Sequence, residues 1–428
     1  MSDSQETADV VIVGGGVIGM SVAYFLSQRR ELSILVIDQN RPGCASMASA
    51  GGLWPIGESV GLGCGVIFFK TLSKRRRERG EAVAIDRPHQ LPAFFFDFCL
   101  TSNAMFPALW ETLKADTGVD FKLERTGLKF VMYDEDDVTY ANHIYSSIPH
   151  LAHHMQWLDA NDLRTREPQV NPAAVGALEF LYDDQVSPFL LTQAYEAGAR
   201  ANGVRVLRDV EVNGVDLHGG RVVSVRAGGR TISCGLMVNA AGAWADQLAH
   251  MVGISVPVTP VRGQIVLSER LPKGFLNGCL STSDCYLAQK DNGEVLIGST
   301  TEQAGFDTTT SVAELRELTR GAVRAVPALA RVNIKRTWAG LRPGTPDEIP
   351  ILGPVPGLKG YLNACGHFRT GMLTSAITGQ ILHDLVFGAT PPIDLTPFLW
   401  QRFSRKPGVG EPQHGLPSLS LEDSLATS

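Results

Sequence analysis

Four residues near the start of the chain have the types and spacing that dinucleotide binding requires. Gly14, Gly16 and Gly19 form the pattern G-x-G-x-x-G, and Asp38 follows about 20 residues after the last glycine. The first glycine permits a tight turn, the second lets the backbone approach a pyrophosphate, and the third lets a helix pack on a strand. The Asp38 carboxylate can accept hydrogen bonds from a ribose hydroxyl. These residues predict a site for an ADP-containing dinucleotide, without distinguishing NAD from FAD.

The neighbouring sequence supplies the elements that must position these residues. The apolar run Val10–Val13 predicts a strand, residues 17–26 predict a helix, and Ile34–Ile37 predicts a second strand. In such a unit, the first helical N–H groups and the positive end of the helix dipole face the phosphates. A glycine-rich loop without a ligand is the alternative. The presence of strand, helix, second strand and acid in this order argues against it.

Composition excludes several classes of function. The chain has 428 residues, of which 44% are hydrophobic and 19% charged, and this is typical of a soluble globular protein of about two or three domains. A net charge of −6 argues against a nucleic-acid binder. The seven cysteines are scattered and contain no C-x-x-C pair, so we expect no disulfide framework and no zinc or iron–sulfur site. Because the first strand starts so early and no apolar run could span a membrane, we expect a cytoplasmic location.

Further along, the chain alternates between patterns of helix, strand and small residues. Amphipathic or apolar helices are predicted over residues 94–115, 160–166, 187–201, 311–325 and 372–386. Strand-and-turn patterns over residues 256–299 are typical of an antiparallel sheet. Apolar residues at 60–69 are followed by a basic run at 70–79, a composition typical of membrane-surface or partner-docking segments. A core strand leading into a solvated helix is the simpler interpretation of that stretch.

Three other patterns are weak. Residues 57–61 match the G-x-S-x-G nucleophile elbow, but the required strand before it and helix after it are not predicted. Residues 65–71 resemble a P-loop in which Phe69 replaces the glycine before the lysine. A histidine-rich segment lacks any established ligand spacing, and we interpret it as a solvated face rather than a metal site. Its histidines are His143, His150, His153 and His154.

Three stretches together resemble the D-amino-acid oxidase superfamily of FAD enzymes, in its glycine/sarcosine oxidase branch. They are the fingerprint, ASAGGL at 48–53, and the pair WAGLRPGTPDEIPILGP (338–354) and GHFRTGMLTSAITG (366–379). Within that branch, the chain is most similar to the membrane-associated, cyanide-forming glycine dehydrogenases. The resemblance extends to about residue 400 and implies an α/β fold, α+β overall, with two discontinuous domains.

On this resemblance, a Rossmann-type FAD-binding domain comprises residues 1–90, 155–250 and 335–403. An antiparallel-sheet substrate domain comprises residues 91–154 and 251–334. The Pro-, Gly- and Ser-rich composition of residues 404–428 predicts a disordered tail. Related sarcosine oxidases tether FAD through a cysteine just before the GLRPG arginine, where this chain has Gly340 and Leu341. The resemblance therefore implies non-covalent FAD. Its expected contacts are Gly14, Gly16, Val17, Ile18, Gly19, Asp38, Gln39, Ala45, Ser46, Ala50, Gly51, Gly52, Val210, Gly242, His367, Phe368, Arg369, Thr370, Gly371, Met372 and Leu373.

The expected substrate is glycine, a small zwitterion that needs a fixed cation for its carboxylate. Arg342 can pair with a carboxylate through two parallel hydrogen bonds, and the resemblance adds Tyr286 and Arg369 to the same site. A structural arginine at 342 and a core tyrosine at 286 are the alternatives. Hydride loss from the α-carbon requires mainly positioning, and no side-chain base is evident.

Several functions remain open. The resemblance favours a glycine dehydrogenase that forms HCN and CO2 and passes electrons to partner subunits of a hetero-oligomer, with peripheral membrane contact. The runners-up are an O2-dependent glycine, sarcosine or D-amino-acid oxidase and a D-amino-acid dehydrogenase subunit of the D-hydroxyproline type. A flavin electron-transfer subunit without a substrate site is the non-enzymatic alternative, which a carboxylate-binding arginine argues against.

Overall fold

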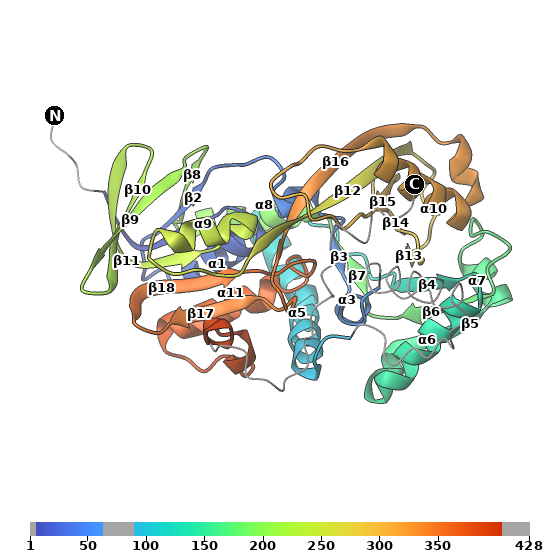
Figure 1. Cartoon of the computed structure of the whole chain (residues 1–428), viewed down its shortest axis with the longest axis horizontal. Coiled ribbons are helices and arrows are strands. Elements are labelled where there is room, and N and C mark those ends of the chain that lie inside the picture. Colours follow the sequence, from blue (N-terminus) through green and yellow to red (C-terminus); the bar gives the residue numbers. More distant parts are fainter. Residues whose placement is uncertain (1–5, 63–89, 405–428) are drawn as a thin grey trace, which may run out of the picture.

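The computed structural model describes residues 6–62 and 90–404. Within them, two large sheets and one two-stranded sheet carry helices on their faces (Figure 1). This is the α/β architecture, α+β overall, that the sequence predicts. The P-loop-like stretch, most of the apolar and basic stretch at 60–79, and the predicted tail beyond residue 404 lie outside the described residues.

The first sheet is built around the N-terminal strand. Its parallel members, in spatial order, are β18 (Leu358–Cys365), β11 (Arg230–Asn239), β1 (Glu6–Val13), β2 (Ile34–Asp38) and β8 (Arg205–Arg208). Two strands pair antiparallel with members of this group: β17 (Ile351–Val355) with β18, and β10 (Arg221–Ala227) with β11. β9 (Val212–His218) pairs antiparallel with β10. Because β1, β2 and β11 are parallel, their carboxyl ends meet at one edge. The fingerprint turn, Asp38 and the residues after Asn239 therefore lie together there.

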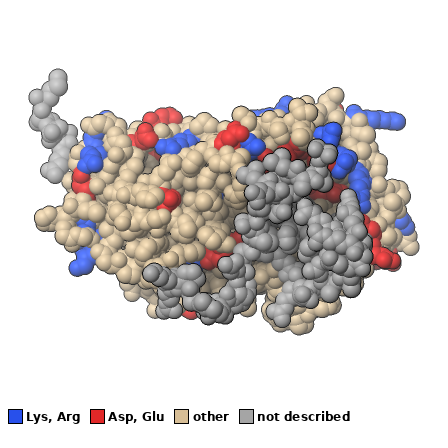
Figure 2. All heavy atoms as spheres, viewed as in Figure 1, with Lys and Arg blue, Asp and Glu red and all other residues tan. Residues whose placement is uncertain are grey.

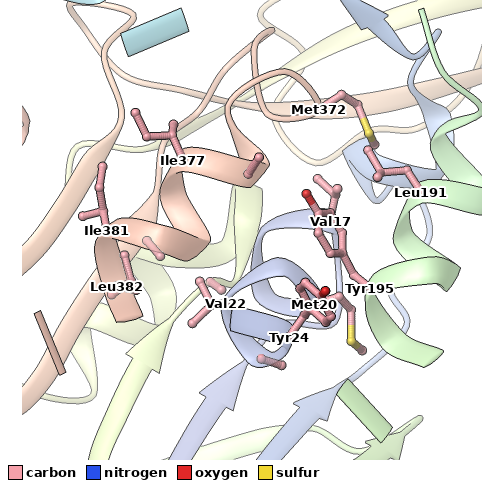
Figure 3. Packing of buried hydrophobic residues seen from close by; sticks show 14 of the residues in the cluster. Val17, Met20, Val22, Tyr24, Leu191, Tyr195, Met372, Ile377, Ile381 and Leu382 are labelled. Atoms are coloured by element: carbon pink, nitrogen blue, oxygen red, sulfur yellow. The ribbon is translucent and has the colours of Figure 1, made fainter. Parts of the chain in front are cut away.

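Alternate residues of β1 face opposite sides of the first sheet. Val10 and Ile12 belong to one hydrophobic core, and Val11 and Val13 belong to another. On the first of these faces, α1 (Val17–Ser27) packs between α8 (Pro188–Ala201) and α11 (Ser375–Phe387) (Figure 3).

Side chains of α1 point toward both neighbouring helices, and Val17, Met20, Val22 and Tyr24 among them are buried (Figure 3). Tyr24 and Tyr195 contact each other with ring centroids 5.8 Å apart. A long helix, α5 (Ala93–Thr117), packs against α8 and α11 from outside. This packing fixes the start of α1, and with it the fingerprint turn.

The second sheet is antiparallel except for one parallel pair, β13 with β4. Its strands, in spatial order, are β16 (Ile334–Gly344), β12 (Thr259–Arg270), β15 (Glu294–Gly298), β14 (Tyr286–Gln289), β13 (Cys279–Ser281), β4 (Leu128–Met132), β6 (Gly176–Phe180) and β5 (Met155–Asp159). This sheet also has a hydrophobic core on each face. A small third sheet, formed by β3 (Gly52–Leu53) and β7 (Asp184–Gln185), joins the small-residue stretch to the segment after β6.

The remaining helices of the described residues are the following. The α-helices are α2 (Ala45–Ala48), α3 (Pro55–Ser59), α6 (Glu135–Ser147), α7 (Ala160–Arg166), α9 (Ala245–His250) and α10 (Val312–Ala325). The 3-10 helices are η1 (Pro149–His154), η2 (Gly242–Trp244), η3 (Pro327–Arg331), η4 (Thr396–Phe398) and η5 (Trp400–Phe403). Helix α10 covers β12 and β15, and α6 packs against β4.

The residue boundaries of the two domains remain a prediction, to which sheet membership adds three adjustments that we propose. β5 and β6, assigned by sequence to the cofactor domain, pair in the second sheet. β16, also assigned there, pairs along its length with β12. Helix α5, assigned to the substrate domain, packs on the helices of the first sheet instead.

Three further features concern function directly. In residues 6–62 and 90–404, no helix has the length and apolar character required to cross a bilayer. Basic and acidic side chains alternate around the rim of the face seen in Figure 2, and the middle of its described part is largely uncharged. Ser59 of the G-x-S-x-G match lies in helix α3, and its hydroxyl donates to the Pro55 carbonyl. The strand and turn of a nucleophile elbow therefore do not form there.

Candidate active site

A cavity of about 720 Å³ collects residues from the carboxyl edge of the first sheet and from the second sheet. It is lined by most of the residues that the sequence predicts for cofactor and substrate. These are Gly14, Gly16, Val17, Ile18, Asp38, Gln39, Ala45, Ser46, Ala50, Gly52, Val210, Gly242, Tyr286, Arg342, His367, Phe368, Arg369, Gly371 and Met372.

Four residues predicted to contact the cofactor do not line the cavity: Gly19, Gly51, Thr370 and Leu373. A Cβ at Gly19 would lie 1.9 Å from the Gly14 carbonyl oxygen, so this glycine lets α1 sit against the fingerprint turn. A Cβ at Gly51 would lie 2.1 Å from the Val186 carbonyl oxygen. Thr370 donates to the His367 carbonyl and Leu373 is buried in the core, so both support the wall from behind.

The fingerprint glycines have the backbone features that their predicted roles require. Gly14 has φ +112°, and a Cβ there would lie 2.2 Å from the Ala240 carbonyl oxygen. Gly16 precedes the first turn of α1, where a Cβ would lie 2.9 Å from the Ser46 hydroxyl. That hydroxyl accepts the Val17 N–H at 2.8 Å. The start of α1 thus presents bare backbone to the cavity, as pyrophosphate binding requires.

Asp38, the predicted ribose acceptor, has a partner that the sequence did not reveal. Its Oδ2 accepts a hydrogen bond from Nη1 of Arg208 at 2.6 Å. The same guanidinium donates to Glu196 at 2.5 Å, and all three residues line the cavity. Arg208 therefore holds the Asp38 carboxylate in place at the end of β2, and the second carboxylate, Glu196, also pairs with Arg200.

The small-residue stretch 48–52 is held by three hydrogen bonds from distant parts of the chain. The Trp338 indole donates to the Ala48 carbonyl at 3.1 Å, and the ammonium group of the half-buried Lys290 donates to the Ala50 carbonyl at 2.5 Å. The Val186 N–H donates to the Gly51 carbonyl at 2.8 Å. Side chains this small let the backbone itself form the cavity wall, and the anchors fix where that wall stands.

Arg342 lies on β16 with its guanidinium in the cavity, held by groups after β15. Its Nη1 donates to the Thr300 carbonyl at 3.0 Å, and its Nη2 donates to the Ser299 hydroxyl at 2.6 Å. The guanidinium covers Gly263 of β12, where a Cβ would lie 2.4 Å from Nη1. Glycine at 263 therefore makes room for the charged group, and the two anchors orient it before any ligand binds.

Tyr286 and Trp54 form an aromatic wall beside Arg342. Their rings meet edge to face with centroids 5.3 Å apart, and a Cβ at Gly298 would lie 2.3 Å from the Tyr286 hydroxyl oxygen. Burial raises the pKa of Tyr286 to about 12, against the opposing effect of Arg342, so the phenol remains a hydrogen-bond donor. The Trp54 indole N–H is buried and has no acceptor among the described residues.

Arg369 also reaches the cavity, but its charge is already compensated. It forms ion pairs with Glu58 at 3.3 Å and with Glu348 at 2.9 Å, and its own side chain is 8% exposed. Burial raises the pKa of Glu58, and the charges of Arg369 and Arg342 oppose this effect. Arg342 is therefore the better-placed cation for a substrate carboxylate.

His367, on the turn before α11, is a neutral member of the wall. Its Nε2 lies 3.0 Å from the Thr378 hydroxyl, and burial lowers the pKa of its imidazole to about 3. The four histidines of the predicted solvated segment lie on α6 and η1. Across the described ranges, no group of three or more His, Cys, Asp or Glu side chains could hold a metal ion.

Comparison with known proteins assigns this cavity to a family. The sequence pattern of the FAD dependent oxidoreductase family matches residues 9–385. The chain belongs to the FAD-dependent oxidoreductases. Hydrogen cyanide synthase subunit HcnC of Pseudomonas protegens is 58% identical to this oxidoreductase over 95% of the chain and 98% of its own length. Glycine oxidase of Geobacillus kaustophilus is 31% identical over 94% of the chain and 98% of its own length.

Solved structures agree with this assignment. The crystal structure of that glycine oxidase superposes with a TM-score of 0.82 at 29% identity, covering 94% of this chain and all of the other. The glycine oxidase of Bacillus cereus superposes with a TM-score of 0.79 at 27% identity, covering 95% of this chain and all of the other. The oxidoreductase therefore has the glycine oxidase fold, as the sequence motifs predict.

The residues of the cavity fit the FAD that the family implies. The bare backbone at the start of α1 can receive a pyrophosphate, and the Asp38 carboxylate stands where a ribose hydroxyl is expected. Around Arg342 and Tyr286 the cavity is walled by aromatic and apolar side chains, which suits a flavin ring beside a small substrate. The sequence did not predict Trp54, Glu58 and Arg208 as lining residues of the cavity. Trp54 and Glu58 come shortly after the small-residue stretch, which is the signal that could have indicated them.

Proposed function

We propose that this protein is a cyanide-forming glycine dehydrogenase that uses non-covalent FAD and acts as the glycine-oxidising subunit of a hydrogen cyanide synthase. Support comes from the extent of the similarity to HcnC, which spans nearly the whole of both chains. Further support comes from the glycine oxidase fold. Residues 340 and 341, just before Arg342, are Gly and Leu, so no cysteine is available there to tether the flavin.

The balanced equation of the proposed reaction gives the number of electrons that each glycine releases. Glycine, C2H5NO2, yields HCN, CO2 and four hydrogen atoms, so each turnover is two successive two-electron oxidations. FAD, when bound, supplies the two-electron acceptor for hydride from the α-carbon. We propose that partner subunits carry these electrons onward.

The chain's own residues bind and orient the substrate. Arg342 forms two parallel hydrogen bonds with the glycine carboxylate, and the Tyr286 hydroxyl donates a third. The edge-to-face wall of Trp54 and Tyr286 leaves space for a small α-carbon. Hydride transfer depends mainly on how the α-carbon is positioned, and the two aromatic rings limit where that carbon can lie.

One geometric observation carries the proposal: a pre-oriented arginine faces the same cavity as the dinucleotide fingerprint. A subunit that only transferred electrons would have no use for such a carboxylate site. An O2-dependent glycine oxidase is the second candidate, and the superposition on glycine oxidase favours it. The two candidates share the substrate site and differ in the electron acceptor.

The test begins with the purified chain and its bound flavin. Glycine, sarcosine and D-alanine are added separately without oxygen while the flavin absorption band is followed, and air is then admitted. Bleaching by glycine with slow recovery in air is expected of a dehydrogenase, whereas fast recovery with peroxide identifies an oxidase. With partner subunits present, cyanide is expected. Glyoxylate in place of cyanide would refute the cyanide-forming reaction.

A further inference from the structure

Lys290, directly after β14, is a cation close to the cavity to which the proposed reaction gives no role. Its ammonium group donates to the Ala50 carbonyl at 2.5 Å and to Oε1 of Gln185 at 2.7 Å. Within the described part of the chain, this ammonium group forms hydrogen bonds but no ion pair. A positive charge without a directly paired carboxylate therefore stands next to the small-residue stretch.

Gln185 holds Lys290 in place and separates it from the carboxylate of Glu124. Gln185 lies on β7, where it pairs with Gly52 of β3. Its Nε2 donates to Oε2 of Glu124 at 2.6 Å and to the Gln289 carbonyl at 3.2 Å, which leaves Oε1 as the atom that faces Lys290. Burial lowers the pKa of Lys290, and the charge of Glu124 opposes this effect. The lysine is thus fixed by side chains that are themselves fixed.

The carbonyl that Lys290 holds belongs to the backbone wall of the cavity. Ala50 and Gly52 line the cavity together with Arg342 and Tyr286, whereas Lys290 does not line it. The ammonium group is therefore joined to the wall from behind, by a single hydrogen bond to Ala50. Because the small side chains of this stretch leave backbone as the wall, no bulky group has to separate the charge from a bound cofactor.

Reduction by hydride gives a flavin ring one negative charge, and a fixed positive charge nearby stabilises that state. We propose that Lys290 is a positioning residue of the cofactor site, which fixes the Ala50 carbonyl and, by its charge, stabilises reduced FAD relative to oxidised FAD. This role goes beyond the proposed function. It requires that the chain binds FAD, as its family implies, but not that glycine is the substrate.

The experiment compares the wild type with K290Q, K290R and K290M, each loaded with FAD. K290Q keeps a hydrogen-bond donor and removes the charge, K290R keeps the charge, and K290M removes both. K122M is the matched control, because Lys122 pairs with Asp291, the residue after Lys290, and with Asp120, and does not line the cavity. The flavin midpoint potential is measured by anaerobic reduction beside a reference dye, and FAD content and thermal stability are recorded.

The expected shift follows from the size of a single charge. At an effective dielectric constant of about 20, a unit charge roughly 10 Å from another changes an equilibrium by about tenfold. For a two-electron reduction, a tenfold change corresponds to about 30 mV. The midpoint potential of K290Q should therefore fall by about 30 mV. K290R and K122M should shift by less than half as much, and K290M should fall like K290Q while retaining less FAD.

A lysine that only supported the wall would give a different result. If K290Q binds FAD weakly, its dissociation constants for oxidised FAD and for dithionite-reduced FAD are measured instead, because the ratio of the two constants determines the shift in potential. That ratio should rise about tenfold in favour of the oxidised form. Equal weakening of both forms, an unchanged potential in K290Q, or an equal fall in K122M would overturn the assignment.

Neither measurement uses a substrate. If glycine fails to reduce the wild-type flavin, the proposed function is wrong, and the potentials of the Lys290 variants still decide what this lysine does.

Discussion

Replacing Arg342 tests the centre of the proposed site. In R342Q the guanidinium is lost, and with it both hydrogen bonds to the substrate carboxylate. A hydrogen bond to a charged group contributes ~1.5–3 kcal/mol, so two of them set an upper range of ~3–6 kcal/mol. Taking the lower end, ~3 kcal/mol corresponds to a rise of about two orders of magnitude in the glycine dissociation constant.

R342K separates charge from geometry. Lysine keeps the positive charge but cannot donate to the Thr300 carbonyl, the Ser299 hydroxyl and a bidentate carboxylate at once. Loss of one hydrogen bond at ~1.5 kcal/mol predicts weakening of about tenfold, between the wild type and R342Q. The order wild type, lysine, glutamine is the expected signature of a carboxylate site.

The assay is anaerobic flavin reduction over a range of glycine concentrations, and R262Q is the matched control. Arg262 lies on β12, beside Arg342 in the sheet, but pairs with Glu302 and Asp307 and does not line the cavity. R262Q should lower stability while leaving glycine affinity within about threefold. An R342Q protein that retains FAD and binds glycine as tightly as the wild type would refute the reasoning.

Three further changes address the cofactor cradle, the aromatic wall and the buried imidazole. G14A should abolish FAD retention or folding, measured by flavin absorption after purification, because its Cβ would lie 2.2 Å from the backbone oxygen of Ala240 at a positive φ. W54A should enlarge the space beside Tyr286, so the rate ratio of D-alanine to glycine should rise about tenfold; an unchanged ratio would place the size limit elsewhere. His367 has a folded-state pKa of about 3, below its unfolded value, so the unfolded state takes up the proton first as pH falls. Unfolding free energy should therefore drop by about 1.4 kcal/mol per pH unit below about 6.5, and H367Q should reduce that slope in urea titrations.

Local patterns predicted the elements well because their signals lie within a few residues of one another. The helix expected over 187–201 begins after Ser187, whose hydroxyl accepts the Leu190 N–H, and includes Pro188 in its first turn. The helix expected over 311–325 has its N-cap at Ser311. The final helix starts at Ser375 rather than Met372: residues 371–374 form turns, and Gly371 and Met372 line the cavity.

The site could be predicted only where its chemistry is local. The fingerprint and Asp38 share one strand–helix–strand unit, so their spacing alone was enough to predict them as a dinucleotide site. Glu58 pairs with Arg369, and Trp54 contacts Tyr286. Both partners are distant in sequence and lie on other elements. No sequence periodicity relates the two members of such a pair. The domain boundaries could not be predicted for the same reason, because β12 and β16 belong to one sheet although many residues separate them in the sequence.

On the proposed reaction, the carboxylate site also decides how many oxidations occur before release. The imino acid formed by the first oxidation keeps the carboxylate of glycine, so its contacts with Arg342 and Tyr286 persist. Hydrolysis to glyoxylate needs water at the α-carbon, so formation of cyanide requires that water be kept from this atom. Trp54 and Tyr286, which are in edge-to-face contact beside Arg342, are the side chains that we expect to do so. The second oxidation converts the carboxylate into CO2, which removes the charge that Arg342 holds and leaves neutral HCN. Retention of the intermediate and release of the product thus depend on the same arginine.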